Sequence, residues 1–129
     1  MCKSSCVLCN NIRISTSVTV VTINGVDTLV IDIPTGNYDS CNPVCIVVAQ
    51  NIPTTATITM PVAVSIGGNT TVVYPIVDCD CVQITACMIQ SRTRYKLHVR
   101  AGANGSVFKA NRGTFCRRNN AVISIPVTQ

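Results

Sequence analysis

The sequence predicts an all-β protein, a single β-sandwich or jelly roll of about eight or nine short antiparallel strands with a short N-terminal arm. Composition is the first reason: the 129 residues include 19 Val, 14 Ile and 15 Thr but only three Leu. β-branched side chains pack well on a pleated surface, whereas helices favour Leu, Ala and Glu. The second reason is that short alternating runs are separated by Gly, Pro and Asn, with no convincing helical period.

The length indicates one domain, which we place at residues 12–129, behind a polar, cysteine-rich arm at residues 1–11. Alternation with period two predicts a first strand over 12–23. Asn24-Gly25 suits the two positive φ angles of a type I′ turn, so residues 26–33 should fold back as a hairpin. A second hairpin turn is expected at Gly67-Gly68-Asn69. The other expected strands are 44–49, 56–60, 62–66, 70–77, 81–89, 92–100, a short one near Val107, and 121–127.

Charge is divided unevenly along the chain, although the net value is only +5. Residues 1–81 hold all five acids and two basic side chains, a balance of −3, while residues 82–129 hold eight basic side chains and no acid, hence +8. Such a division suits an acidic external partner, or head-to-tail packing against copies of the same chain. We therefore expect the protein to work as a multimer.

One segment alternates between basic and other residues over nine positions. In a strand, this pattern places the basic side chains in one row and turns the intervening ones, including Tyr95, to the core. The row is either a solvated outer face that blocks sheet-to-sheet pairing or an interface for an acidic protein surface. A track for nucleic-acid phosphates is disfavoured, because no exposed aromatic side chain is interleaved for base stacking. The candidate interface residues are Arg92, Arg94, Lys96, His98 and Arg100.

The nine cysteines are an odd number, so at least one thiol is free, binds metal or pairs with another chain. Cys2, Cys6 and Cys9 lie on the arm, where they suit cross-linking between chains or three of four zinc ligands; reduced thiols without function are the simpler alternative. Cys87, in an apolar run, is expected in the core. Further candidates for a metal or a disulfide are Cys41, Cys45, Cys79, Cys81 and Cys116.

The sequence contains no recognisable set of catalytic residues. His98 is the only His, and no nucleophile motif, phosphate-binding loop or carboxylate pair accompanies it. We expect no enzyme activity and no cofactor. Zinc is the one open alternative, and it is disfavoured because two paired C-x-x-C motifs are absent. No secretory signal and no membrane-spanning run is visible, so synthesis in the cytoplasm is expected, without a membrane partner.

In general type, the strand-rich body from Ile12 to Val127 resembles the small auxiliary, or decoration, proteins of tailed-bacteriophage capsids. These are often β-sandwiches that attach to a shell as clustered oligomers, so the resemblance implies a structural role in a virion. The arm from Met1 to Cys9, followed by β structure, is similar to the subunits of bacterial endospore appendages, whose cysteines lock an extracellular fibre with disulfides. A zinc- or nucleic-acid-binding module remains the alternative from another class.

Overall fold

The computed structural model describes residues 11–36, 38, 43–102 and 105–111, and this part of the chain is all-β, as predicted. The elements are β1 (Ile12–Ile14), β2 (Ser17–Ile23), β3 (Val26–Ile33), β4 (Val44–Val48), β5 (Val62–Ile66), β6 (Asn69–Val77), the short 3-10 turn η1 (Ala86–Met88), β7 (Thr93–Gly102) and β8 (Gly105–Ala110). The predicted strand at 121–127 lies outside the described residues.

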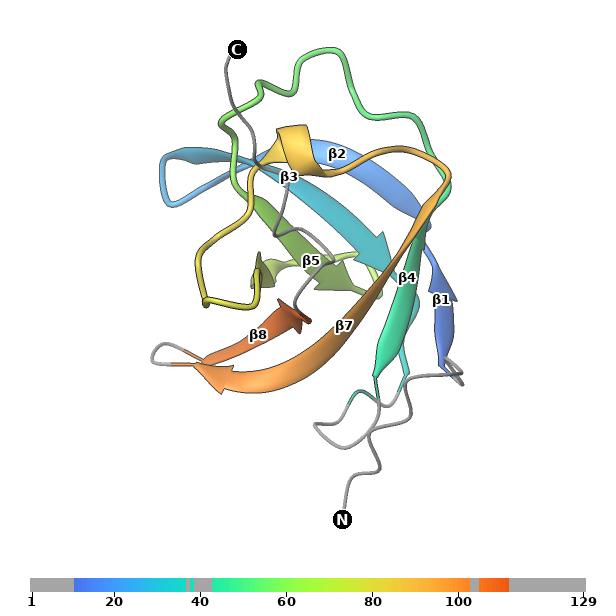
Figure 1. Ribbon diagram of the computed structural model, residues 1–129. Coiled ribbons are helices and arrows are strands. Elements are labelled where there is room, and N and C mark those ends of the chain that lie inside the picture. Colours follow the sequence, from blue (N-terminus) through green and yellow to red (C-terminus); the bar gives the residue numbers. More distant parts are fainter. Residues whose placement is uncertain (1–10, 37, 39–42, 103–104, 112–129) are drawn as a thin grey trace, which may run out of the picture.

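The eight strands form one curled sheet in the order β1-β4-β7-β8-β6-β5-β3-β2 (Figure 1). The sheet is mixed, because β1 with β4, β3 with β5, and β6 with β8 run parallel. The prediction of antiparallel strands throughout was therefore wrong for these three pairs. Each of them joins strands that are not neighbours along the chain, and alternation within a strand does not reveal such pairing. The curled sheet is also not clearly divided into the two layers of a sandwich.

Two tight turns fix the register of the hairpins. Asn24 and Gly25 have φ angles of 51° and 81°, as a type I′ turn requires, and β2 and β3 pair without a break from Ile23 opposite Val26. Gly67 and Gly68 have φ angles of 64° and 80° and join β5 to β6. Both turns were predicted from the sequence.

The predicted first strand, 12–23, is split at a corner into β1 and β2. The backbone N–H of Ser15 still donates to the carbonyl of Val47 on β4, at 2.9 Å, but that of Thr16 donates to Asp32 on β3, at 2.8 Å. Ser15 is buried, and its hydroxyl accepts a hydrogen bond from the Ala49 backbone N–H. The polar Ser15 is thus satisfied where the strand changes partners, and the chain itself joins the two edges of the sheet.

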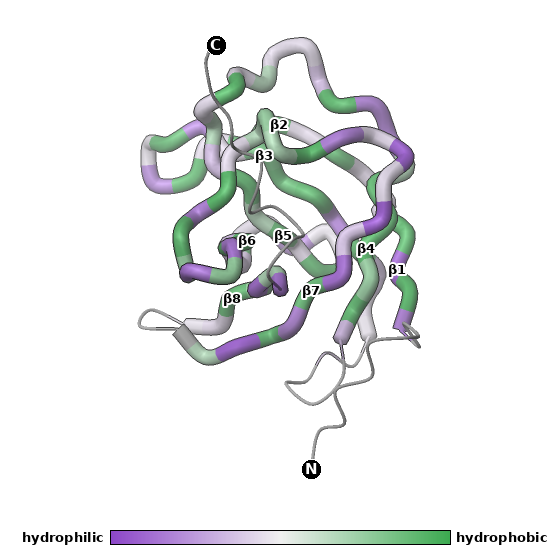
Figure 2. The backbone as a smooth tube through the Cα atoms, viewed as in Figure 1, coloured by the Kyte–Doolittle hydropathy of each residue, from purple (hydrophilic) through white to green (hydrophobic). Residues whose placement is uncertain are grey.

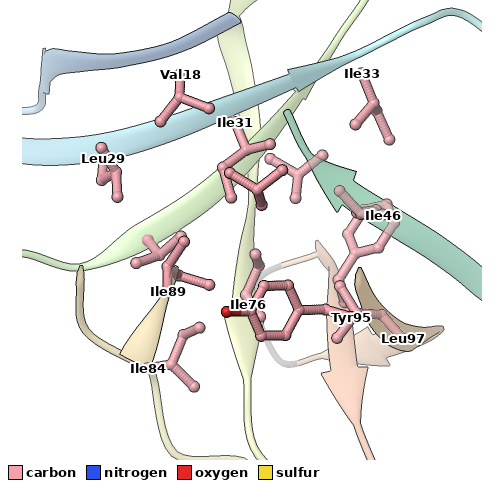
Figure 3. Packing of buried hydrophobic residues seen from close by; sticks show 14 of the residues in the cluster. Val18, Leu29, Ile31, Ile33, Ile46, Ile76, Ile84, Ile89, Tyr95 and Leu97 are labelled. Carbon is pink, nitrogen blue, oxygen red and sulfur yellow. The ribbon is translucent and has the colours of Figure 1, made fainter. Parts of the chain in front are cut away.

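The concave side of the sheet encloses one hydrophobic core of Val, Ile and Leu, completed by two aromatic rings (Figure 3). Three side chains of β3 belong to this core: Leu29, Ile31 and Ile33 point inward and are at most 1% exposed. Phe108 on β8 and Tyr95 on β7 fill the remaining space, at 2% and 7% exposure. Burial of this kind contributes about 25 cal/mol for each Å² of apolar surface, so the alternation of β-branched residues is also the main source of stability.

The predicted strand at 56–60 was wrong. The backbone of this segment is folded into turns, in which Ala56 N–H donates to Pro53 and Met60 N–H donates to Thr57. Only Met60 is buried against the core, while Ile58 is 71% exposed. The carbonyls of Ile58 and Met60 accept hydrogen bonds from the N–H groups of Cys87 and Ala86, so the segment pairs with η1 and not with a strand.

The predicted strand at 81–89 was also wrong. The Asp78 carboxylate accepts hydrogen bonds from the N–H groups of Asp80 and Val82, at 2.8 and 3.0 Å, and so folds the chain into a turn. Isolated bridges at Gln83 and Thr85 follow, and then η1. When a side chain accepts hydrogen bonds from nearby backbone N–H groups in this way, those groups are not available for pairing with a neighbouring strand.

Candidate functional site: a basic face on β7 and β8

The alternation predicted for the basic segment is present in β7. Tyr95 and Leu97 are buried in the core, and Val99 packs against it. The intervening side chains lie on the opposite, outer side of the sheet, where successive positions are about 6.6–6.8 Å apart. Figure 2 shows the resulting alternation of hydrophilic and hydrophobic positions along this strand. The outer side chains are Arg94, Lys96, His98 and Arg100.

A fifth basic residue, missed in the sequence analysis, joins this row from β8. Lys109 pairs directly with His98 across the β7–β8 ladder, so the two side chains share the outer side. The β8 alternation was visible in the sequence, since Phe108 and Ala110 are the buried positions on either side of Lys109. We call the surface formed by Arg94, Lys96, His98, Arg100 and Lys109 the basic face.

Arg92, the first member of the predicted row, is not part of the strand. It lies in the turn before β7 with a φ of +56°, and its backbone N–H donates to Val48. Because a left-handed residue interrupts the alternation, Arg92 belongs to the turn, although its side chain is exposed.

His98 is half-buried at the centre of the basic face. Desolvation lowers its pKa below the ordinary value of 6.5, and the charges of Arg100 and Lys96 lower it further. Its Nε2 lies 3.2 Å from the side-chain amide nitrogen of Asn111, and Lys109 is its cross-strand neighbour. The imidazole is therefore neutral at pH 7, and protonation would add one charge among three cations.

The basic face has an apolar flank. β1 lies next to β4, which lies next to β7, and the register aligns Ile12 with Cys45 and Lys96, and Ile14 with Val47 and Arg94. Ile12 and Ile14 are 49% and 58% exposed. At about 4.8 Å for each strand, exposed isoleucines lie roughly 10 Å from a row of cations, which is a mixture typical of protein contact surfaces.

Two of the acidic side chains lie on a strand that is distant from β7 in the sheet. Asp27 and Asp32 belong to β3, which is four places from β7 in the strand order. The Asp32 carboxylate accepts hydrogen bonds from Ser65 Oγ and Gly68 N–H, both at 2.7 Å, and from Thr16 Oγ1. The separation of charge in space is only partial, because Asp78 and Asp80 directly follow β6, whose Val77 is paired with Lys109 of the basic face.

The structure separates the cysteine candidates into two kinds. Cys45 and Cys79 are each disulfide-bonded, whereas Cys81 and Cys87 are free and exposed. The expectation that Cys87 is a core residue was wrong, because η1 turns it outward, with its Sγ 3.1 Å from Thr85 Oγ1. The predictions for Cys2, Cys6, Cys9, Cys41 and Cys116 concern residues outside the part of the chain that the structure describes.

Among the residues that the structure describes, no group of three or more His, Cys, Asp or Glu side chains is placed to hold a metal ion. Within the same residues, no helix has the length and apolar character needed to cross a membrane.

Comparisons with known proteins found no matching family model, no matching curated protein and no matching solved structure.

Proposed function

We propose that the chain is a non-enzymatic structural protein that assembles as a multimer on or into a larger particle, with the basic face as a contact surface. We favour the role of a capsid auxiliary protein. We also propose that the chain is related to the sandwich or jelly-roll proteins of that type. A subunit of a disulfide cross-linked fibre is the alternative. In either case the final location is a virion or an extracellular assembly.

The observation that carries the proposal is the position of the cations. They lie on the outer side of β7 while the inner side is fixed in the core by Tyr95 and Leu97, so they are held on a rigid element. The exposed Ile12 and Ile14 beside them favour an interface over a merely solvated surface. The exposed Asp27 on β3 offers an acidic partner on a second copy, which would give a head-to-tail arrangement. Nucleic acid is less well suited as a partner, since Tyr95 is buried and unable to stack on a base.

Light scattering on the full chain tests the proposal. At about 0.15 M salt we expect species larger than a monomer, and at about 1 M salt, where charges are screened beyond roughly 3 Å, a shift toward the monomer. Arg94→Glu should weaken association about tenfold or more, because it places a negative charge where the proposed partner surface is acidic. The melting temperature should stay unchanged, since the Arg94 side chain is exposed.

Arg92→Glu is the matched control, because it makes the same charge change two residues away, outside the basic face. If the two charge reversals weaken association equally, the cause is the net charge of the chain and not the basic face. A chain that stays monomeric at every salt concentration, and binds no particle from its native source, would contradict the structural role. Electron microscopy of native material separates a shell from a fibre.

A further inference from the structure

β2 is the outermost strand at one end of the described sheet, where it pairs with β3 on one side. Its seven residues are Ser, Val, Thr and Ile, without a charge, a proline or a glycine. Native proteins protect the edge of a sheet by keeping the edge strand short, by charging it or by covering it. β1, the strand at the other end, has only three residues. β2 is neither short nor charged, which indicates that another segment covers it.

The backbone groups of β2 that face away from β3 follow from the geometry of the hairpin. Ile23 and Val26 flank a two-residue turn and form a hydrogen-bonded pair, and such pairs alternate along an antiparallel ladder. The N–H groups and carbonyls of Val18, Val20 and Thr22 therefore point to the open side. In the described part of the chain, no backbone hydrogen bond outside the β2–β3 ladder involves these three residues. They are available to pair with one further strand.

The same chain contains a segment that matches this edge. Residues 121–127 lie outside the described part, and their alternation predicts a strand with Ile123 and Ile125 on one face. On β2, Val18 is buried and Val20 packs against the core, so an apolar face beside them would continue the inner side of the sheet. The segment carries no charge, in agreement with the uncharged edge.

The length and direction of the chain allow this pairing. β8 ends at Ala110 and lies four places from β2, so a ninth strand beyond β2 is about 24 Å away along the sheet. Residues 112–120 are able to span about 30 Å. The pairings between β8 and β2 show that these two strands run in the same direction. A chain that leaves β8, crosses the end of the sheet and returns is therefore antiparallel to β2.

Charge favours the same arrangement. An antiparallel strand would begin beside the Ile23 end of β2, where Asp27 of β3 is exposed. The residues shortly before the segment include Arg117 and Arg118, so opposite charges would meet at this end of the hairpin. We propose that residues 121–127 cover the edge of β2 as an antiparallel strand and keep it from pairing with other copies of the chain.

Amide hydrogen exchange, followed residue by residue by NMR, tests the proposal on the full chain at about 1 M salt, where contacts through the basic face are screened. We expect the N–H groups of Val18, Val20 and Thr22 to be protected. Ile125→Asp places a charge on the apolar face of the segment and should speed their exchange about tenfold or more. Ser124→Asp is the matched control, because it makes the same change on the opposite face of the segment, and it should leave their exchange unchanged.

Thr19 and Val21, whose N–H groups bond to β3, should stay protected in both variants, which would show that the sheet is intact. Ile125→Asp should also form larger species that persist at about 1 M salt, because pairing between backbone groups, unlike contact between charges, is not screened.

Three results would overturn the proposed cover: unprotected edge amides in the wild type, protection that survives Ile125→Asp, or equal acceleration by Ser124→Asp. Protection that is lost on dilution would assign the edge to a second copy instead. If Ile125→Asp exchanges fast at the edge but stays monomeric, the segment does not prevent association, and that part of the proposal is wrong.

Discussion

Asp32 ties three parts of the sheet together, and its removal should be costly. Asp32→Ala removes the acceptor of the Ser65 hydroxyl, which is fully buried, and an unsatisfied buried donor costs about 1–3 kcal/mol. Thr16 and the Gly68 N–H are exposed and able to bond to water instead, so each adds about 0.5–1 kcal/mol. We therefore expect the free energy of unfolding to fall by about 2–5 kcal/mol at pH 7.

Asp27→Ala is the matched control. It removes a carboxylate from the same strand, but this carboxylate is exposed and accepts one hydrogen bond, from Thr22 Oγ1 at 2.7 Å. Its loss should cost less than about 1 kcal/mol. Urea denaturation followed by circular dichroism measures both variants against the wild type, and the midpoint shifts should differ while the slopes agree.

The pH dependence gives a second readout for Asp32. Burial raises the pKa of its carboxyl, but the hydrogen bonds from Thr16, Ser65 and Gly68 outweigh burial and hold the pKa below the ordinary 3.8. Because the folded-state pKa is depressed, the stabilisation is complete above the unfolded value and is lost as the pH falls through the folded value. The gap between wild type and Asp32→Ala should thus close below about pH 3.8. Equal losses in the two Asp variants, or a gap that widens in acid, would refute the reasoning.

Three further changes test the core, a loop and the basic face. Phe108→Ala should lower the free energy of unfolding by about 3–5 kcal/mol, because it removes a large side chain that is only 2% exposed; calorimetry measures this. Tyr95→Phe removes the acceptor for the Gln90 N–H, at 2.8 Å, and should cost about 0.5–1.5 kcal/mol and speed amide exchange at Gln90. Desolvation, Arg100 and Lys96 hold the pKa of His98 below 6.5, so association should strengthen as the pH falls below 6.5 and His98 gains charge. His98→Gln should abolish this pH response in light scattering, and a response that persists would assign it to another group.

The sequence was most informative where the signal is local. β3 and β5 were predicted at their observed bounds, because alternation and a two-residue turn act together at Asn24-Gly25 and Gly67-Gly68. It was least informative where a polar side chain takes over backbone partners, as at Ser15 and Asp78. Parallel pairing was also not predictable, because the residues of β4 that pair with β1 are 33 positions further along the chain.

The candidate site shows the same limit. The row on β7 follows from alternation alone, so Arg94 to Arg100 were predictable. Lys109 lies beside this row because β7 pairs with β8, and Arg92 is not part of the row because its own backbone is left-handed.

The corner at Ser15 also determines how the domain responds to tension. A pull on the chain at Asn11 is carried first by β1, whose ladder with β4 involves three residues, and reaches β2 only beyond the corner. The ladder between β2 and β3 involves seven residues. β1 should therefore detach at a lower force than β2, and the freed segment adds about 3.3 Å of length for each residue released. A domain held in an assembly by the chain ahead of β1 would have an extensible joint that lengthens before the core is disturbed.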